Sequence, residues 1–183
     1  MPNWPELMDK HGPLVWSTIR RLVNHPEDAA DCFQEVFVAA LALSRKEHVL
    51  SWTATLRHLA NKKAIDSLRR RYRSPTLVST ESAVELMDSS TVSPQQQLAS
   101  AELAGALRTS LALIEPRQAE VFCMVCLDAM TYSEVATAMG INENHVGVLL
   151  NRARSSLKQR LHAYAPTTRD PKNKGKSPNA IHE

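Results

Sequence analysis

The sequence predicts an all-α protein built from two small helical modules joined by a linker. Only 5 of the 183 residues are glycine, and aromatic residues make up 5% of the chain. Ala, Leu, Arg and Gln are frequent, which favours helix over sheet. Apolar residues also recur with a helical period over several long stretches. A Ser-, Thr- and Gln-rich segment with two prolines, residues 74–98, interrupts that period and divides the chain.

The first module, residues 1–73, should contain three helices. The first has an expected irregularity at Gly12 and Pro13, because proline disturbs a helix interior. The second should begin at Pro26, whose fixed φ suits a first turn and which two acids follow. The third has an apolar stripe and a basic opposite face. The expected helices cover residues 4–23, 26–43 and 52–72.

The second module should begin after a flexible acidic linker, residues 74–100. Its first expected helices run from about residue 101 to 114 and from Pro116 to Leu127. The run "VFCMVCL" is apolar throughout, so the second of them should be buried on nearly all sides. The module ends near residue 161, and the Pro-rich, charged tail 162–183 is expected to be disordered.

The stretch "TYSEVATAMGINENHVGVLLNRAR" predicts two helices joined by a sharp turn. Thr131 and Glu134 form a capping box for a helix over residues 132–139. Gly140 can adopt the left-handed conformation that ends it, and Asn142 can cap the next helix. Ala136 is small enough for the two helices to cross closely. This is the pattern of a helix-turn-helix, although a helical hairpin in an ordinary bundle would share part of it.

The second helix of such a motif presents its solvent-facing residues to the DNA major groove. Asparagine side chains can read base edges, and arginine side chains suit phosphates. The candidate DNA-binding residues of this module are Asn144, His145, Val148, Asn151, Arg152 and Arg154.

The net charge is only +3, but acidic and basic residues occupy separate segments of the chain. Residues 24–44 carry four acids and no Lys or Arg, whereas residues 57–73 carry seven cations and one acid. Such segregation indicates partners of different sign, and the basic helix favours nucleic acid. Solvated acidic and basic helix faces are the plainer alternatives.

In this order the features resemble the extracytoplasmic-function (ECF) class of bacterial sigma factors, the initiation subunits of RNA polymerase. The stretch "EDAADCFQEVFVAAL" is similar to the family's acidic helix, which binds the largest subunit of the polymerase. The resemblance implies core RNA polymerase as a partner and Asp31, Gln34 and Glu35 as the contact residues.

"LRHLANKKAIDSLRRRYR" is similar to the family's promoter-melting helix, which engages the minus-10 element. Lys62 stands where the family usually has Asn, with Asn61 one place earlier, and Thr55 replaces the usual Trp. By this resemblance, the residues expected at the DNA backbone are Lys62, Lys63, Arg69, Arg70, Arg71 and Arg73.

In the second module, "MTYSEVATAMGI" and "NRARSSLKQRL" resemble the start and end of the family's minus-35-reading region. Glu115 and Ala119 depart from its preceding Leu-Pro-x-x-x-Arg pattern. Gly147 and Leu149 stand where Lys or Arg is often found, so the resemblance predicts less charge on the reading face. Promoter DNA is the implied second partner, and in the family an anti-sigma factor can be a third.

Other chemistries find little support in the sequence. Cys123 and Cys126 have the spacing of half a zinc site but no further nearby ligands, so both are expected to be core thiols. No Gly-rich phosphate loop or nucleophile–base set appears, and neither enzyme activity nor a cofactor is expected. No signal sequence or membrane-length apolar run appears, so a cytoplasmic location without membrane insertion is expected.

Two other functions remain open at this point. One is a transcriptional regulator whose helix-turn-helix sits on an unrelated helical sensor domain and which acts without polymerase. The acidic motif of residues 28–37 counts against it. The other is a helical adaptor or inhibitor with no DNA role, and the two basic helices count against that.

Overall fold

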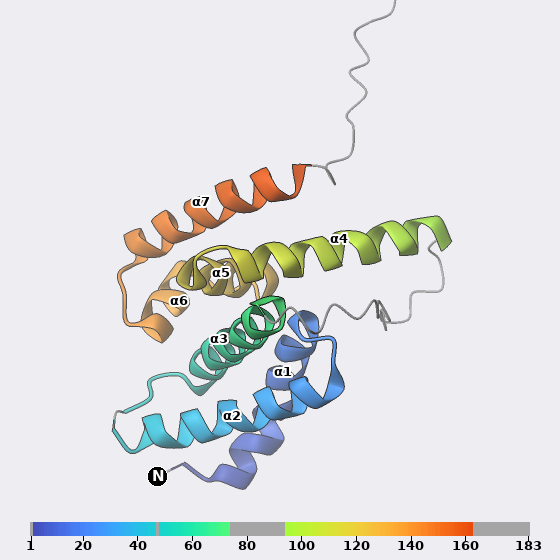
Figure 1. Ribbon diagram of the computed structural model, residues 1–183. Coiled ribbons are helices and arrows are strands. Elements are labelled where there is room, and N and C mark those ends of the chain that lie inside the picture. Colours follow the sequence, from blue (N-terminus) through green and yellow to red (C-terminus); the bar gives the residue numbers. More distant parts are fainter. Residues whose placement is uncertain (1, 47, 74–93, 163–183) are drawn as a thin grey trace, which may run out of the picture.

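The computed structural model describes residues 2–46, 48–73 and 94–162, and within these ranges the chain is helical, with no strand. The all-α prediction is therefore confirmed. Figure 1 shows the helices stacked around α3, with α1 and α2 on one side and α4, α5 and α6 on the other. The elements are α1 (Trp4–Leu22), α2 (Pro26–Ser44), α3 (Trp52–Arg73), α4 (Pro94–Leu113), α5 (Pro116–Phe122), a π-helix (Cys123–Leu127), α6 (Tyr132–Met139) and α7 (Glu143–Arg160).

The apolar core is continuous across the two expected modules. One buried cluster joins Val15 and Ile19 of α1 to Ile65 of α3 and Leu111 of α4. A second cluster fills the helix-turn-helix and includes Ala54 of α3. Because α3 contributes buried residues to both clusters, the two modules do not have separate apolar cores. Burial of its apolar residues on both sides holds the helices together.

Two local expectations differ from the structure. α1 continues through Pro13, because tertiary packing around the buried Gly12 outweighs the lost backbone hydrogen bond. α4 begins at Pro94, so residues 94–100, expected in the linker, are helical. Proline at the first turn and the Gln and Ala residues that follow favour this start. The remaining linker residues 74–93, and tail residues 163–183, lie outside the described residues.

The apolar run after α5 also departs from expectation. It is a π-helix rather than a continued α-helix, and Cys126 within it is exposed. The wider turn of a π-helix shifts the faces of the residues that follow it. Cys123 remains buried, so only one of the two expected core thiols lies in the core.

The sharp turn between α6 and α7 is built as the sequence predicts. The backbone N–H of Thr131 donates to Glu134 Oε2 at 2.8 Å, and the N–H of Glu134 donates to Thr131 Oγ1 at 3.3 Å. Gly140 ends α6 at φ 63° and ψ 39°, in the left-handed region. Asn142 Oδ1 accepts from the N–H of His145 at 2.8 Å and caps α7. The capping box, the glycine turn and the second cap are therefore confirmed.

Gly140 and Gly105 offer a matched pair for testing the turn. At both glycines an added Cβ would meet nothing within 4 Å, but only Gly140 has a positive φ. Gly140→Ala should lower the free energy of unfolding by about 1–2 kcal/mol, the cost of the left-handed conformation. Gly105→Ala, inside α4, should raise it by about 1 kcal/mol. Urea unfolding followed by circular dichroism measures both, and a stabilising Gly140→Ala would contradict the turn.

Candidate polymerase- and nucleic-acid-binding surfaces

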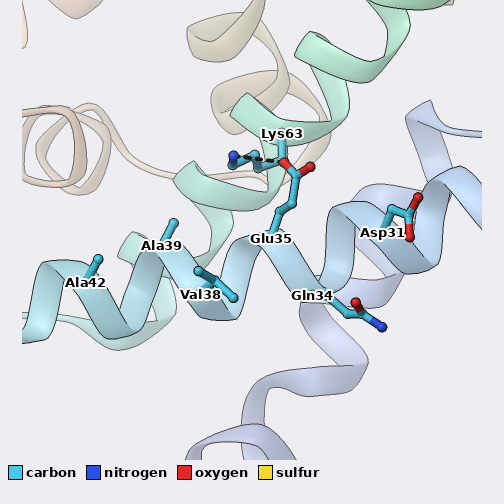
Figure 2. Close-up of a pocket in the computed structure, with 7 residues that line it drawn as sticks. All are labelled: Asp31, Gln34, Glu35, Val38, Ala39, Ala42 and Lys63. Carbon is cyan, nitrogen blue, oxygen red and sulfur yellow. Dashed lines mark ion pairs between the residues drawn. The ribbon is translucent and has the colours of Figure 1, made fainter.

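The outer face of α2 carries an open groove of about 440 Å³. Asp31 and Gln34 are exposed beside it, and Val38 is 67% exposed. Figure 2 shows these side chains along one helix, with Lys63 reaching across from α3. The groove therefore offers a carboxylate and an amide next to exposed apolar surface. Its lining residues are Asp31, Gln34, Glu35, Val38, Ala39, Ala42 and Lys63.

Two ion pairs join the acidic helix to the basic helix. Lys63 Nζ lies 2.9 Å from Glu35 Oε2, and Arg71 lies 3.5 Å from Asp28 Oδ2. The hydrogen bond from Lys63, together with its charge, lowers the pKa of the Glu35 carboxyl. Glu35 is thus already engaged within the chain, whereas Asp31, one turn earlier on α2, is exposed and makes no ion pair with the described residues of α3.

The six basic residues expected at the DNA do not share one environment. Lys62, Arg70 and Arg73 are exposed, and a period of 3.6 residues places Lys62 and Arg73 on one face of α3. Arg70 lies closer to the side of α2, where its charge contributes to the lowered pKa of Glu35. Lys63 and Arg71 turn toward α2. Arg69 donates to the carbonyls of α4's end, at 3.2 Å to Ala112 and 2.7 Å to Ile114.

The recognition face of α7 is open to solvent. Among the described residues, all six predicted positions are exposed: Asn144, His145, Val148, Asn151, Arg152 and Arg154. Arg154 also contacts the sulfur of Cys126 at 3.8 Å. Leu149, however, is 6% exposed and belongs to the core, so its lack of charge does not alter the reading face. Gly147 is half-buried, and an added Cβ would contact the Tyr132 ring at 3.6 Å.

Buried polar residues at the junction of α3 with the second half of the chain were missed by sequence reasoning. Asp128, in the connection before α6, accepts from Asn61 Nδ2 at 2.5 Å and from Arg21. His58 Nε2 lies 3.4 Å from Glu120 Oε2. The sequence held one signal for these contacts: Glu120 and Asp128 flank the apolar run of residues 121–127. A charged side chain beside buried residues needs a polar partner, which predicts contacts of this kind.

Chemical sites of other kinds find little support in the geometry. Within residues 2–46, 48–73 and 94–162, no group of three or more His, Cys, Asp or Glu residues is placed to hold a metal. Burial raises the pKa values of the Cys32 and Cys123 thiols. Raised pKa values keep these thiols protonated and poorly nucleophilic. No helix in the described part of the chain combines the length and apolar character needed to cross a bilayer.

Two sigma-70 family models match the two halves of this arrangement, the first over the acidic and basic helices and the second over the helix-turn-helix. The family model "Sigma-70 region 2" matches residues 7–74, and "Sigma-70, region 4" matches residues 104–157. A similar curated protein is the ECF RNA polymerase sigma factor SigE of Mycolicibacterium smegmatis. It is 25% identical over 173 residues, a match that covers 92% of this chain and 65% of SigE.

Solved structures agree with the fold. The sigma factor RpoE of Bartonella quintana, solved with the anti-sigma factor NepR, matches with a TM-score of 0.54 and 17% identity. The match covers 88% of this chain and 98% of RpoE. Both sigma-70 regions are matched in order, and the ECF sigma factor SigE matches 92% of this chain. The chain therefore belongs to the ECF sigma factor family.

The Glu35–Lys63 pair makes a testable electrostatic prediction. Lys63→Ala should raise the pKa of Glu35 toward its ordinary value, measured by NMR of the carboxyl carbon. Since the folded-state pKa is lowered, the pair stabilises the fold at neutral pH, and this stabilisation is lost as pH falls through the lowered pKa. Both groups are partly exposed, so the effect on stability should not exceed about 1 kcal/mol.

Lys62→Ala is the matched control for that titration. Lys62 is the sequence neighbour of Lys63 but lies on the exposed face of α3. It should leave the titration of Glu35 unchanged. An equal response to the two substitutions would show that general charge, not the pair, sets this pKa.

Proposed function

We propose that this protein is an initiation factor that binds core RNA polymerase, recognises promoter DNA and helps to melt it. The acidic face of α2 is the proposed polymerase-binding surface, with Asp31, Gln34 and Glu35 at its centre. The exposed faces of α3 and α7 are the proposed DNA-binding surfaces. The chain spans 65% of the length of its curated ECF relative, and the family assignment underlies this role.

The groove on α2 is the observation that carries the proposal. A carboxylate and an amide stand exposed beside Val38, Ala39 and Ala42, which offer apolar surface. Such a groove suits a helix that presents both cations and apolar side chains. Because Asp31 is not held by an ion pair to α3, its charge is available to that partner, unlike that of Glu35.

At the minus-10 element, we assign backbone contacts first to Lys62, Arg70 and Arg73. All three residues are exposed on α3, and their charge can follow a single strand. Asn61 does not compensate for the Lys62 substitution here, since its side chain is 1% exposed and donates to Asp128. Lys63 and Arg71 already pair with acids of α2, so contact with DNA would compete with these pairs. Arg69 donates to Ala112 and Ile114 through Nη1 alone, which leaves its other N–H groups for phosphate.

At the minus-35 element, recognition depends on the neutral N-terminal half of the α7 face. Asn144, Asn151 and His145 can exchange hydrogen bonds with base edges, and Val148 can contact a thymine methyl. Arg152 and Arg154 supply phosphate contacts. Base selection therefore rests on hydrogen bonding and shape more than on charge.

A third proposed partner is an anti-sigma factor. The solved RpoE structure contains one, and this chain shares the RpoE fold. The proposed role is that of a non-enzymatic initiation factor, as in the family.

Reconstituted transcription tests the proposal directly. With core polymerase and a promoter library, the wild type should direct initiation, and Asp31→Lys should reduce it by about tenfold or more, because a buried like-charge contact costs several kcal/mol. Asp9→Lys makes the same charge change on the exposed side of α1 and should leave initiation nearly unchanged. Wild-type protein that directs no initiation at any promoter would remove the proposal.

Salt dependence tests the DNA-binding face of α7. The affinity of the protein for duplex promoter DNA should fall with salt at a log–log slope of about 0.9 per phosphate contact. Arg152→Ala should reduce that slope by about 1, whereas Val148→Ala should weaken binding and leave the slope unchanged. Fluorescence anisotropy over a salt series measures both. An affinity that does not vary with salt would refute the phosphate contacts.

A further inference from the structure

Tyr132 lies at the start of the helix-turn-helix and packs beside the recognition helix α7. It is the first residue of α6, directly after the N-cap Thr131. A Cβ added at Gly147 of α7 would lie 3.6 Å from Cε2 of the Tyr132 ring. Because Cε2 is bonded to the carbon that carries the hydroxyl, the polar end of the ring faces the glycine. The missing side chain of Gly147 therefore gives the phenol a place at the edge of α7.

That edge borders the residues proposed to read the minus-35 element. Residues three and four positions apart are neighbours on a helix surface, so Gly147 lies beside Asn144 and Asn151. Both asparagines are exposed, as is Val148. The family resemblance places a Lys or Arg at position 147, where this chain has neither. The polar end of Tyr132 thus lies next to the position from which that cation would extend.

The ring of Tyr132 is partly covered, but its hydroxyl is not used within the fold. Tyr132 is 39% exposed, and its hydroxyl makes no hydrogen bond within residues 2–46, 48–73 and 94–162. The exposed Tyr72 differs, because its hydroxyl accepts from Thr109 Oγ1 at 3.0 Å. A partly covered tyrosine hydroxyl usually finds a hydrogen-bond partner. The donor of Tyr132 is therefore available to a ligand outside the chain.

The place of Tyr132 in the motif favours a phosphate over a base edge. In a helix-turn-helix the first helix crosses the DNA backbone, while the second enters the major groove. Tyr132 opens the first of these helices, and tyrosine is among the side chains that donate to phosphate oxygens. Glu134, the acid in the first turn of α6, accepts from the N–H and the hydroxyl of Thr131 at 2.8 and 2.9 Å. Its carboxylate is therefore held at the cap.

We propose that Tyr132 is a DNA-contacting residue, whose hydroxyl donates to a backbone phosphate beside the minus-35 element in place of a cation at position 147. This inference rests on the proposed function of α7. Because the phenol is neutral, it binds the phosphate through a directional hydrogen bond and releases no counterion. The contact therefore helps to fix the register of α7 on the duplex and adds nothing to the salt dependence of binding.

Removal of the hydroxyl oxygen alone tests the contact. Tyr132→Phe keeps the ring beside Gly147 and should weaken binding of the full chain to a fluorescein-labelled minus-35 duplex, selected by the wild type from a promoter library. The loss should be about tenfold, since a hydrogen bond to a charged group is removed. It should be equal at every salt concentration and for every base sequence, with the thermal unfolding midpoint unchanged. Tyr72→Phe removes the same atom from an exposed tyrosine of α3 and should leave the affinity unchanged.

A double-mutant cycle connects the hydroxyl to position 147. Gly147→Lys should steepen the log–log salt slope by about 1, because it adds a cation that can neutralise a phosphate. If the two groups contact the same phosphate, their effects are not additive. Tyr132→Phe should then cost about threefold or less in the Gly147→Lys background, against about tenfold in the wild type.

Each outcome bears on the inference. Tyr132→Phe that binds as tightly as the wild type, or that changes base preference instead of overall affinity, would overturn it. Equal losses in the two backgrounds would refute the replacement of a cation by the phenol. Binding that Arg152→Ala weakens and Tyr132→Phe does not would remove only this inference and leave the role of α7 standing. Duplex binding by no variant, the wild type included, would remove both.

Discussion

The arrangement depends on the burial of α3 on both of its sides. Leu56, Ala60, Ala64 and Ile65 are all fully buried. The two alanines let neighbouring helices approach closely, as ridge-into-groove packing requires. α1 and α2 cover one side and α4 to α6 the other, so α3 can show solvent only a narrow strip. A partner of α3 can therefore contact only the residues on that exposed strip.

The packing of α3 also decides where the acidic and basic residues meet. On the sequence, acids and bases occupy separate helices, which suggests separate surfaces. In the fold, α2 and α3 lie side by side, and Lys63 and Arg71 bridge to acids of α2. Partly exposed pairs of this kind add little stability. Their effect is local: they pair charges along the border between the two helices, whereas Asp31 and Lys62 remain exposed.

Local signals explain why so much of the fold could be predicted. The Thr131–Glu134 capping box, the Gly140 turn and the prolines at 26 and 116 each act within four residues, so the sequence encodes them directly. The π-helix, the exposure of Cys126 and the carbonyl contacts of Arg69 could not be predicted. The carbonyls that Arg69 contacts lie 43 and 45 residues away, and periodicity carries no information about such contacts. Leu149 illustrates the limit, since the resemblance placed it on the reading face and packing places it in the core.

The junction between α3 and the second half of the chain combines apolar burial with polar contacts at its edge. Ile65 of α3 and Leu111 of α4 belong to one buried cluster, so the apolar core crosses the junction without a break. Arg69 donates through a single guanidinium nitrogen, Nη1, to the carbonyls of Ala112 and Ile114. Because an arginine carries five N–H donors, the other N–H groups of Arg69 can still bind another acceptor. The apolar core therefore fixes the arrangement of the helices, while the polar edge of α3 keeps donors for a partner.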